Sequence, residues 1–120
     1  MTKTTHPILI VEDDQATQTL MQTLMQRYGY SSVVAPDGQT AIDLLREGDF
    51  TAVVLDLMMP NVSGHDVIDF LAREKKSVPV VVCTAAGPTH TAGFDPSVVR
   101  AVLRKPFDIE VLMSTIVALV

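Results

Sequence analysis

Five polar or charged side chains stand at or just after the ends of short apolar runs: Glu12, Asp13, Asp56, Thr84 and Lys105. Three carboxylates brought close together repel one another, so such a group needs compensating positive charge. A lysine supplies part of that charge. A divalent cation can supply the rest, since an all-oxygen site of carboxylates and a backbone carbonyl suits Mg²⁺ with several retained waters. A carboxylate can also accept a phosphoryl group as an aspartyl phosphate, so these residue types indicate magnesium-assisted phosphoryl chemistry.

The apolar runs themselves indicate buried strands. They lie at residues 8–11, 32–35, 52–55, 78–83 and 101–103. The runs are rich in valine and isoleucine and are continuous rather than alternating, which is typical of strands covered on both faces. Four of the five lead into a polar or charged side chain.

The segments between and after the runs are amphipathic and predict helices over parts of 15–30, 37–49, 65–76 and 108–120. In the first segment, apolar spacing places six side chains toward the core, with Gly29 ending the helix: Thr17, Leu20, Met21, Leu24, Met25 and Tyr28. Asp108 is placed to cap the last helix.

Strands and helices in strict alternation predict a parallel sheet covered on both faces by right-handed crossovers. In such α/β folds, binding and chemistry take place beyond the carboxyl ends of the strands. The fold therefore brings the five polar side chains to one edge. A single carboxylate at a strand end could equally cap the next helix, and a lone lysine could be a surface residue. Their joint arrival at one edge favours a functional site.

Composition limits the remaining classes. A chain of 120 residues is the size of one domain. The net charge of −5 makes nucleic acid an unexpected direct partner, because DNA binding depends on neutralising phosphates. The first apolar run is too short for a signal peptide or a membrane span, so a cytoplasmic protein is expected. The single cysteine, Cys83, excludes an internal disulfide and is interpreted as a small buried hydrophobic residue.

Five motifs in order resemble the receiver domains of two-component response regulators, including the chemotaxis receivers: ILIVEDD, Asp37–Gly38, VVLDLMMPNVSG, VPVVVCTA and LRKPF. The resemblance extends from about Ile8 to the end of the chain. It implies a single receiver domain over residues 1–120. It also implies a doubly wound, five-stranded parallel sheet in the flavodoxin-like order 2-1-3-4-5, with helices on both faces.

The resemblance also implies a role for each site residue. Asp56 would be the phosphoacceptor, and Glu12 with Asp13 the acidic pair that serves Mg²⁺. Asp56 and the backbone carbonyl of Met58 would complete the protein ligands. Thr84 would bond the phosphoryl group through its hydroxyl, and Lys105 would contact it.

Two further residues are interpreted from their places beside these motifs. Asp14 falls one place beyond the acidic pair and is read as the cap of the first helix. Pro106 matches a proline whose preceding peptide bond is typically cis in this family.

The implied function is signalling rather than enzymatic, although receivers catalyse their own phosphorylation and dephosphorylation. The phosphoryl donor would be a partner histidine kinase or phosphotransfer protein, and phosphorylation would alter binding to a downstream protein or effector domain. Residues 116–120 form an unbroken apolar run. It packs the last helix on the sheet, forms a homodimer contact or begins a helix that continues further.

Two departures from the family pattern leave a second interpretation open. Receivers commonly carry an aromatic residue three places before the lysine, where this chain has Val102. Residues 85–100 contain Gly87, Pro88, Gly93 and Pro96, which predict a short or irregular fourth helix. The alternative is therefore a degenerate receiver that acts as a protein-interaction module without phosphorylation.

Two other protein classes fit less well. An aspartyl-nucleophile phosphatase would want a second acidic residue two places after the nucleophile, where this chain has Met58. A flavodoxin-like cofactor module would need a hydroxyl-rich and amide-rich loop after the first strand. The sequence EDDQ at that place would repel a phosphate.

Overall fold

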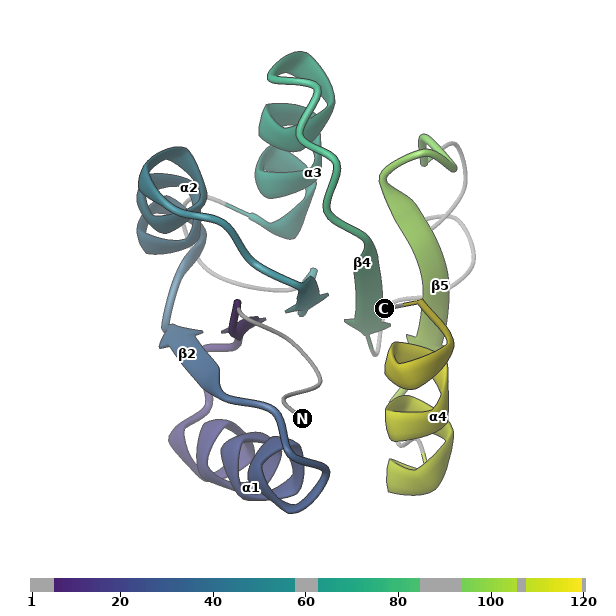
Figure 1. Ribbon diagram of the computed structural model, residues 1–120. Coiled ribbons are helices and arrows are strands. Elements are labelled where there is room, and N and C mark those ends of the chain that lie inside the picture. Colours follow the sequence, from purple (N-terminus) through teal and green to yellow (C-terminus); the bar gives the residue numbers. More distant parts are fainter. Residues whose placement is uncertain (1–5, 58–62, 85–93, 106–107, 120) are drawn as a thin grey trace.

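The computed structural model describes residues 6–57, 63–84, 94–105 and 108–119. Strands and helices alternate along the chain through most of its length (Figure 1). Their bounds are β1 (Ile8–Val11), α1 (Gln15–Arg27), β2 (Ser32–Ala35), α2 (Gly38–Glu47), β3 (Ala52–Leu55), α3 (Gly64–Arg73), β4 (Val80–Thr84), β5 (Val99–Arg104) and α4 (Ile109–Leu119).

The five strands form one parallel sheet in the order β2-β1-β3-β4-β5, which confirms the predicted fold class. The pairing of β1 with β3 aligns Val11 with Leu55, so the next residues, Glu12 and Asp56, emerge side by side. At the other side of the sheet, Thr84 aligns with Arg104, and Lys105 follows directly. The register of the sheet therefore sets which polar side chains meet at its edge.

Both faces of the sheet are covered, as the continuous apolar runs predict. Helices α2 and α3 lie on one face and α1 and α4 on the other (Figure 1). A hydrophobic core lies on each face of the sheet, and alternate residues of a strand belong to opposite cores. Leu9 and Val11 face α2 and α3, while Ile8 and Ile10 face α1 and α4. This double burial explains why β1, β3 and β4 lack a polar face.

The predicted inward stripe of α1 is partly wrong. Met21 and Met25 are buried, but Leu20 is 48% exposed and Tyr28 36% exposed. The helix ends at Arg27, and Gly29 then adopts a positive φ of 86°, which turns the chain. Tyr30 fills the core in place of Tyr28, and its N–H donates to the carbonyl of Met25 at 2.9 Å.

The last two strands differ from their predicted limits. Strand β4 begins at Val80 rather than residue 78, since Pro79 has no N–H to donate to a ladder. Strand β5 begins at Val99 and includes the exposed Arg100, because an edge strand needs to be apolar on one side only. A search for continuous apolar residues therefore finds the middle of such a strand and misses its ends.

The predicted irregular fourth helix falls mainly on residues 85–93, which lie outside the described residues. The part that is described, residues 94–98, forms a turn rather than a helix before β5. Among the described residues, none of the helices combines the length and the hydrophobicity that a membrane span requires.

Helix α2 begins at an aspartate cap. The Asp37 carboxylate accepts a hydrogen bond from the Thr40 N–H at 2.7 Å. Hydrogen bonds from the backbone and side chain of Thr40 lower the pKa of Asp37 below its usual value. A lowered pKa in the folded state means that the charged cap stabilises the fold above the unfolded-state pKa. That stabilisation is lost as the pH falls through the folded-state pKa.

We expect Asp37→Ala to lower the free energy of unfolding by about 1 kcal/mol at neutral pH, because an N-cap acceptor is lost. The difference from the wild type should begin to shrink as the pH falls below about 4, the usual pKa of an aspartate in an unfolded chain, and should be lost as the pH falls through the lowered folded-state pKa. Urea unfolding at a series of pH values measures both effects. Asp37→Asn is the control, since it keeps an acceptor that does not titrate. A wild-type advantage over Asp37→Ala that stays constant down to strong acid would contradict the prediction.

Candidate functional site

The predicted site residues within the described part of the chain meet at the carboxyl edge of the sheet. Glu12 and Asp13 follow β1, Asp56 follows β3, Thr84 ends β4 and Lys105 follows β5. Glu12, Asp56 and Thr84 are buried, whereas Asp13 is exposed. The carbonyl of Met58 and the peptide bond before Pro106, both part of the expected site, lie outside the described residues.

Carboxylate oxygens of Glu12, Asp13 and Asp56 lie within 4.8 Å of one another. The sheet ladder holds two of these residues, because the Glu12 N–H donates to Ala35 at 3.1 Å and the Asp56 N–H donates to Val11 at 3.0 Å. Three carboxylates form the hard, all-oxygen donor set that Mg²⁺ prefers. Two oxygens bound to one Mg²⁺ are at most about 4.2 Å apart, so only a small adjustment of these side chains would be needed. The residues present therefore fit a magnesium ion.

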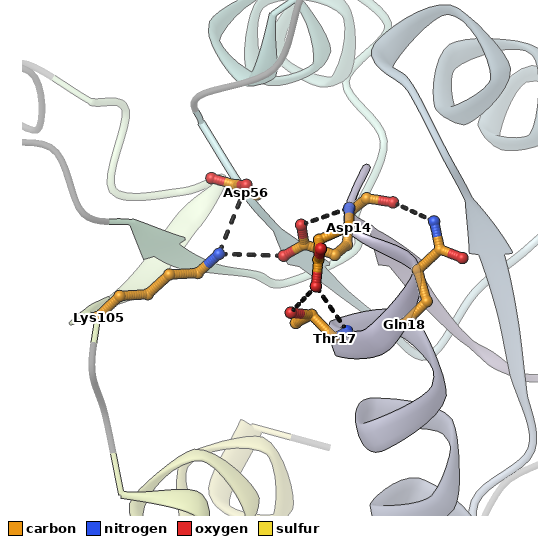
Figure 2. Close-up of polar contacts among 6 residues, drawn as sticks. Asp14, Thr17, Gln18, Asp56 and Lys105 are labelled. Atoms are coloured by element: carbon orange, nitrogen blue, oxygen red, sulfur yellow. Dashed lines mark hydrogen bonds and ion pairs between the residues drawn. The ribbon is translucent and has the colours of Figure 1, made fainter.

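Lys105 brings the positive charge into this cluster (Figure 2). Its Nζ lies 3.0 Å from Glu12 Oε1 and 3.5 Å from Asp56 Oδ2. The Lys105 N–H donates to the carbonyl of Thr84 at 2.9 Å, which fixes the lysine to the end of the sheet. The ammonium group can thus neutralise negative charge beside Asp56.

In both Glu12 and Lys105, the effect of burial on the pKa is opposed by hydrogen bonds and nearby charges of opposite sign. Burial is the main cause that raises the pKa of Glu12, and hydrogen bonds from the Asp14 N–H and from Lys105 only partly offset it. Burial alone would lower the pKa of Lys105. The hydrogen bond to Glu12 and the charges of Asp56 and Glu12 outweigh burial, so the pKa of Lys105 is raised and the ammonium form is kept.

Asp14 caps α1, as expected, and does not belong to the acidic cluster. Its carboxylate accepts hydrogen bonds from the Thr17 N–H at 2.9 Å and the Thr17 hydroxyl at 2.6 Å. These bonds lower the pKa of Asp14. Figure 2 shows the Asp14 and Thr17 side chains together at the start of the helix.

Sequence reasoning missed Gln18. The Gln18 side-chain amide donates from Nε2 to the backbone carbonyl of Glu12 at 2.7 Å (Figure 2). The bond spans six residues and belongs to no standard capping pattern, so the spacing of residue types gives no signal for it.

Two other expectations are informative here. Cys83 is buried beside the site, and burial raises the pKa of its thiol to about 12, in agreement with an unreactive thiol. Val102 is 41% exposed on β5, at the position where the family pattern has an aromatic side chain.

Gly64 allows α3 to start directly against the site. A Cβ atom at this position would lie 2.7 Å from the Asp56 carbonyl oxygen and 2.7 Å from Leu57 Cα. Both atoms belong to the backbone, so neither can rotate away. The Gly64 N–H also donates to the carbonyl of Leu57 at 3.3 Å. A glycine here thus fixes how closely the helix approaches the end of β3.

We expect Gly64→Ala to lower the free energy of unfolding by about 1–3 kcal/mol, since overpacking must move the backbone at Asp56 and Leu57. This loss should appear although alanine favours helices more than glycine does. Gly48→Ala is the matched control, because the nearest atom to its new Cβ is the Leu44 carbonyl oxygen at 3.8 Å. The control should change stability by no more than about 0.5 kcal/mol. Equal losses in urea unfolding of the two variants would count against the close approach.

Comparison with known proteins identifies the family. The pattern of the response regulator receiver domain matches residues 8–117. The chain belongs to this family.

A curated relative and one solved structure support this assignment, and a second solved structure shares the fold. The uncharacterized transcriptional regulatory protein YkoG of Bacillus subtilis is 34% identical over 111 residues, which cover 91% of this chain and 48% of that protein. The receiver domain of the Francisella response regulator 1452 superposes with a TM-score of 0.87 at 25% identity, covering 95% of each chain. The response regulator TrrA of Thermotoga maritima, solved in complex with Mg(2+)-BeF, superposes with a TM-score of 0.86 at 24% identity, covering 96% of this chain and 99% of that one.

The chain spans about half the length of the curated relatives it matches. The expectation that nucleic acid is not a partner conflicts with the name of YkoG, which describes a transcriptional regulator. That expectation came from the acidic charge of these 120 residues. The charge of one domain carries no information about the remainder of a longer protein.

Proposed function

We propose that this chain is a phosphorylatable receiver whose Asp56 accepts a phosphoryl group from a phosphohistidine in a Mg²⁺-dependent step. The observation that carries the proposal is the position of Asp56, buried among the acidic cluster with Lys105 Nζ 3.5 Å from its Oδ2. A nucleophilic carboxylate, a site for a cation and a lysine for the transferring oxygens are thereby brought together.

Each residue has a distinct part in the transfer. An oxygen of Asp56 forms the new O–P bond, while the P–N bond to the donor histidine breaks and the imidazole nitrogen keeps the electron pair. Lys105 lies where its ammonium group can contact the phosphoryl oxygens, and the Thr84 hydroxyl bonds another of them. Mg²⁺, when bound, would neutralise negative charge on the transferring oxygens.

The proposed magnesium ligands are Glu12, Asp13, Asp56 and the backbone carbonyl of Met58. In the family pattern the second residue of the acidic pair binds the ion directly and the first acts through a water molecule. Asp13 would therefore be the direct ligand, and Glu12 would act through water. The carboxylate spacing supports this assignment. The structural likeness to TrrA, which was solved with Mg(2+)-BeF, agrees with it.

Phosphorylation would act on other proteins by shifting the population of receiver conformations. The proposed donor is a histidine kinase or phosphotransfer protein, and the proposed target is a downstream protein or an attached effector domain. We place the protein in the cytoplasm and treat residues 1–120 as one signalling domain rather than an enzyme. A homodimer contact through α4 stays a prediction. Ile116 is buried against the sheet, while Val117 is 45% exposed and could meet a partner.

The decisive test is phosphorylation by a small phosphodonor. We expect incubation with acetyl phosphate and Mg²⁺ to add one phosphoryl group to the wild-type protein, detected by intact mass. Asp56→Asn should add none, because the nucleophilic carboxylate is gone. Omission of Mg²⁺ with EDTA present should also suppress the adduct.

Amide NMR of the same samples separates a working switch from uncoupled chemistry. Shifts that reach residues 94–104 would show that phosphorylation changes the face around β5 despite Val102. Shifts confined to the neighbourhood of Asp56 would mean that the output is uncoupled. No adduct under any condition would favour the degenerate receiver.

A second prediction concerns the competition between Lys105 and the cation. Lys105→Met should strengthen Mg²⁺ binding, because the ammonium group no longer neutralises Glu12 and Asp56. Lys76→Met removes the same charge just before β4, at the opposite edge of the sheet, and serves as the control. Mg²⁺ titrations at constant ionic strength, followed by NMR, give the dissociation constants. Unchanged or weaker binding in Lys105→Met would show that the lysine does not compete.

A further inference from the structure

The turn between β1 and α1 carries both members of the acidic pair, so the geometry of this turn sets the distance between their carboxylates. The Glu12 N–H donates to Ala35 at 3.1 Å, which extends the sheet into the turn. The Asp14 N–H donates to Glu12 Oε2 at 3.0 Å, and the Gln18 N–H donates to the carbonyl of Asp14 at 2.9 Å as the helix begins. The carbonyl of Glu12 is bonded by the Gln18 side chain.

This last bond acts on the peptide group that joins the two acidic residues. The carbonyl of Glu12 and the N–H of Asp13 belong to one planar unit, so they rotate together. An acceptor fixed at 2.7 Å from Gln18 Nε2 therefore fixes the orientation of this whole unit. That orientation sets the direction in which the Asp13 side chain leaves the backbone.

Asp13 depends on its backbone more than the other two carboxylates do. The Glu12 carboxylate is bonded by the Asp14 N–H and by Lys105. Asp56 is buried at the end of β3 and paired with Lys105. Asp13 is exposed, and within the described residues its side chain makes no hydrogen bond or ion pair. The peptide orientation is thus the restraint that keeps Asp13 near the cluster.

We infer that Gln18 is a positioning residue for the cation site: its side-chain amide holds the Glu12–Asp13 peptide so that both carboxylates face Asp56. This inference rests on the proposed function, because it concerns binding of Mg²⁺ by the same cluster. Groups that orient metal ligands typically change metal affinity by 10- to 100-fold when they are removed. We expect a loss near the lower end, about tenfold, because Asp13 keeps its carboxylate and loses only its orientation.

Gln18→Met tests the hydrogen bond with little change in side-chain length. Gln22→Met is the matched control, since Gln22 is an exposed glutamine one turn further along α1. Each EDTA-treated protein is titrated with MgCl₂ at constant ionic strength and followed by amide NMR, and its thermal midpoint is measured without metal. We expect a roughly tenfold larger dissociation constant for Gln18→Met and a wild-type value for Gln22→Met. The midpoints of the two variants should be similar.

A spectroscopic readout distinguishes positioning from a general loss of structure. Removing the bond to the Glu12 carbonyl should shift the Asp13 amide resonance in the metal-free protein, while resonances of residues 20–27 stay in place. Should Gln18→Met fail to fold, Gln18→Asn replaces it, because asparagine keeps the amide but is too short to reach the carbonyl.

The outcomes separate the two levels of the argument. If the wild type and Gln18→Met bind Mg²⁺ equally, or if the Asp13 resonance does not move, the inference about Gln18 is wrong while the magnesium site stands. If the wild type binds no Mg²⁺, the proposed function itself fails, and the role of Gln18 fails with it.

Discussion

Two carboxylates, Glu12 and Asp56, are buried side by side at the ends of adjacent strands, and the Lys105 ammonium lies 3.0 Å and 3.5 Å from their oxygens. Burying an ionised group is costly unless a partner of opposite charge and hydrogen bonds compensate it. The rest of the site follows from this constraint. Lys105 must stay close to both acids, and its N–H bond to Thr84 at the end of β4 keeps it there. The geometry of the sheet at its carboxyl edge therefore provides the positive charge that the two buried carboxylates need.

The register of the sheet sets where the backbones of Glu12, Asp56 and Lys105 emerge. Because β1 and β3 are parallel neighbours in register, the residue after each strand must emerge at the same height. The same holds for β4 and β5, whose register brings Lys105 beside Thr84. Gly64 completes the arrangement, since the backbone of α3 approaches the Asp56 carbonyl to a distance that excludes a side chain. The order of strands thus converts four separate places in the sequence into one site.

Much of this arrangement could be predicted from the sequence, and what escaped prediction has a physical reason. Apolar runs that end in polar groups are visible in one dimension, so the strands and the convergence of Glu12, Asp56 and Lys105 were predictable. The inward residue at the end of α1 was not, because Gly29 turns the chain and exchanges Tyr28 for Tyr30. The ends of β5 were missed because an edge strand is apolar on one side only. Gln18 was missed because its bond to Glu12 joins a side chain to a backbone carbonyl across a turn whose shape no residue type encodes.

Glu12 and Asp13 differ in their contacts and exposure, and the lengths of their side chains explain the difference. Glutamate at position 12 has one more methylene than aspartate, and its carboxylate reaches both the Asp14 N–H and the Lys105 ammonium. The Glu12 carboxylate therefore orders the turn through the Asp14 N–H and holds the Lys105 ammonium. Burial raises the pKa of Glu12. Asp13 has the shorter side chain and lies exposed, so its carboxylate is available to a cation at small desolvation cost. Lys105 compensates the negative charge of Glu12 and Asp56 without a bound cation. In the proposed magnesium site, a cation would compete with the lysine for Glu12 and Asp56, while Asp13 would offer a ligand that the lysine does not hold.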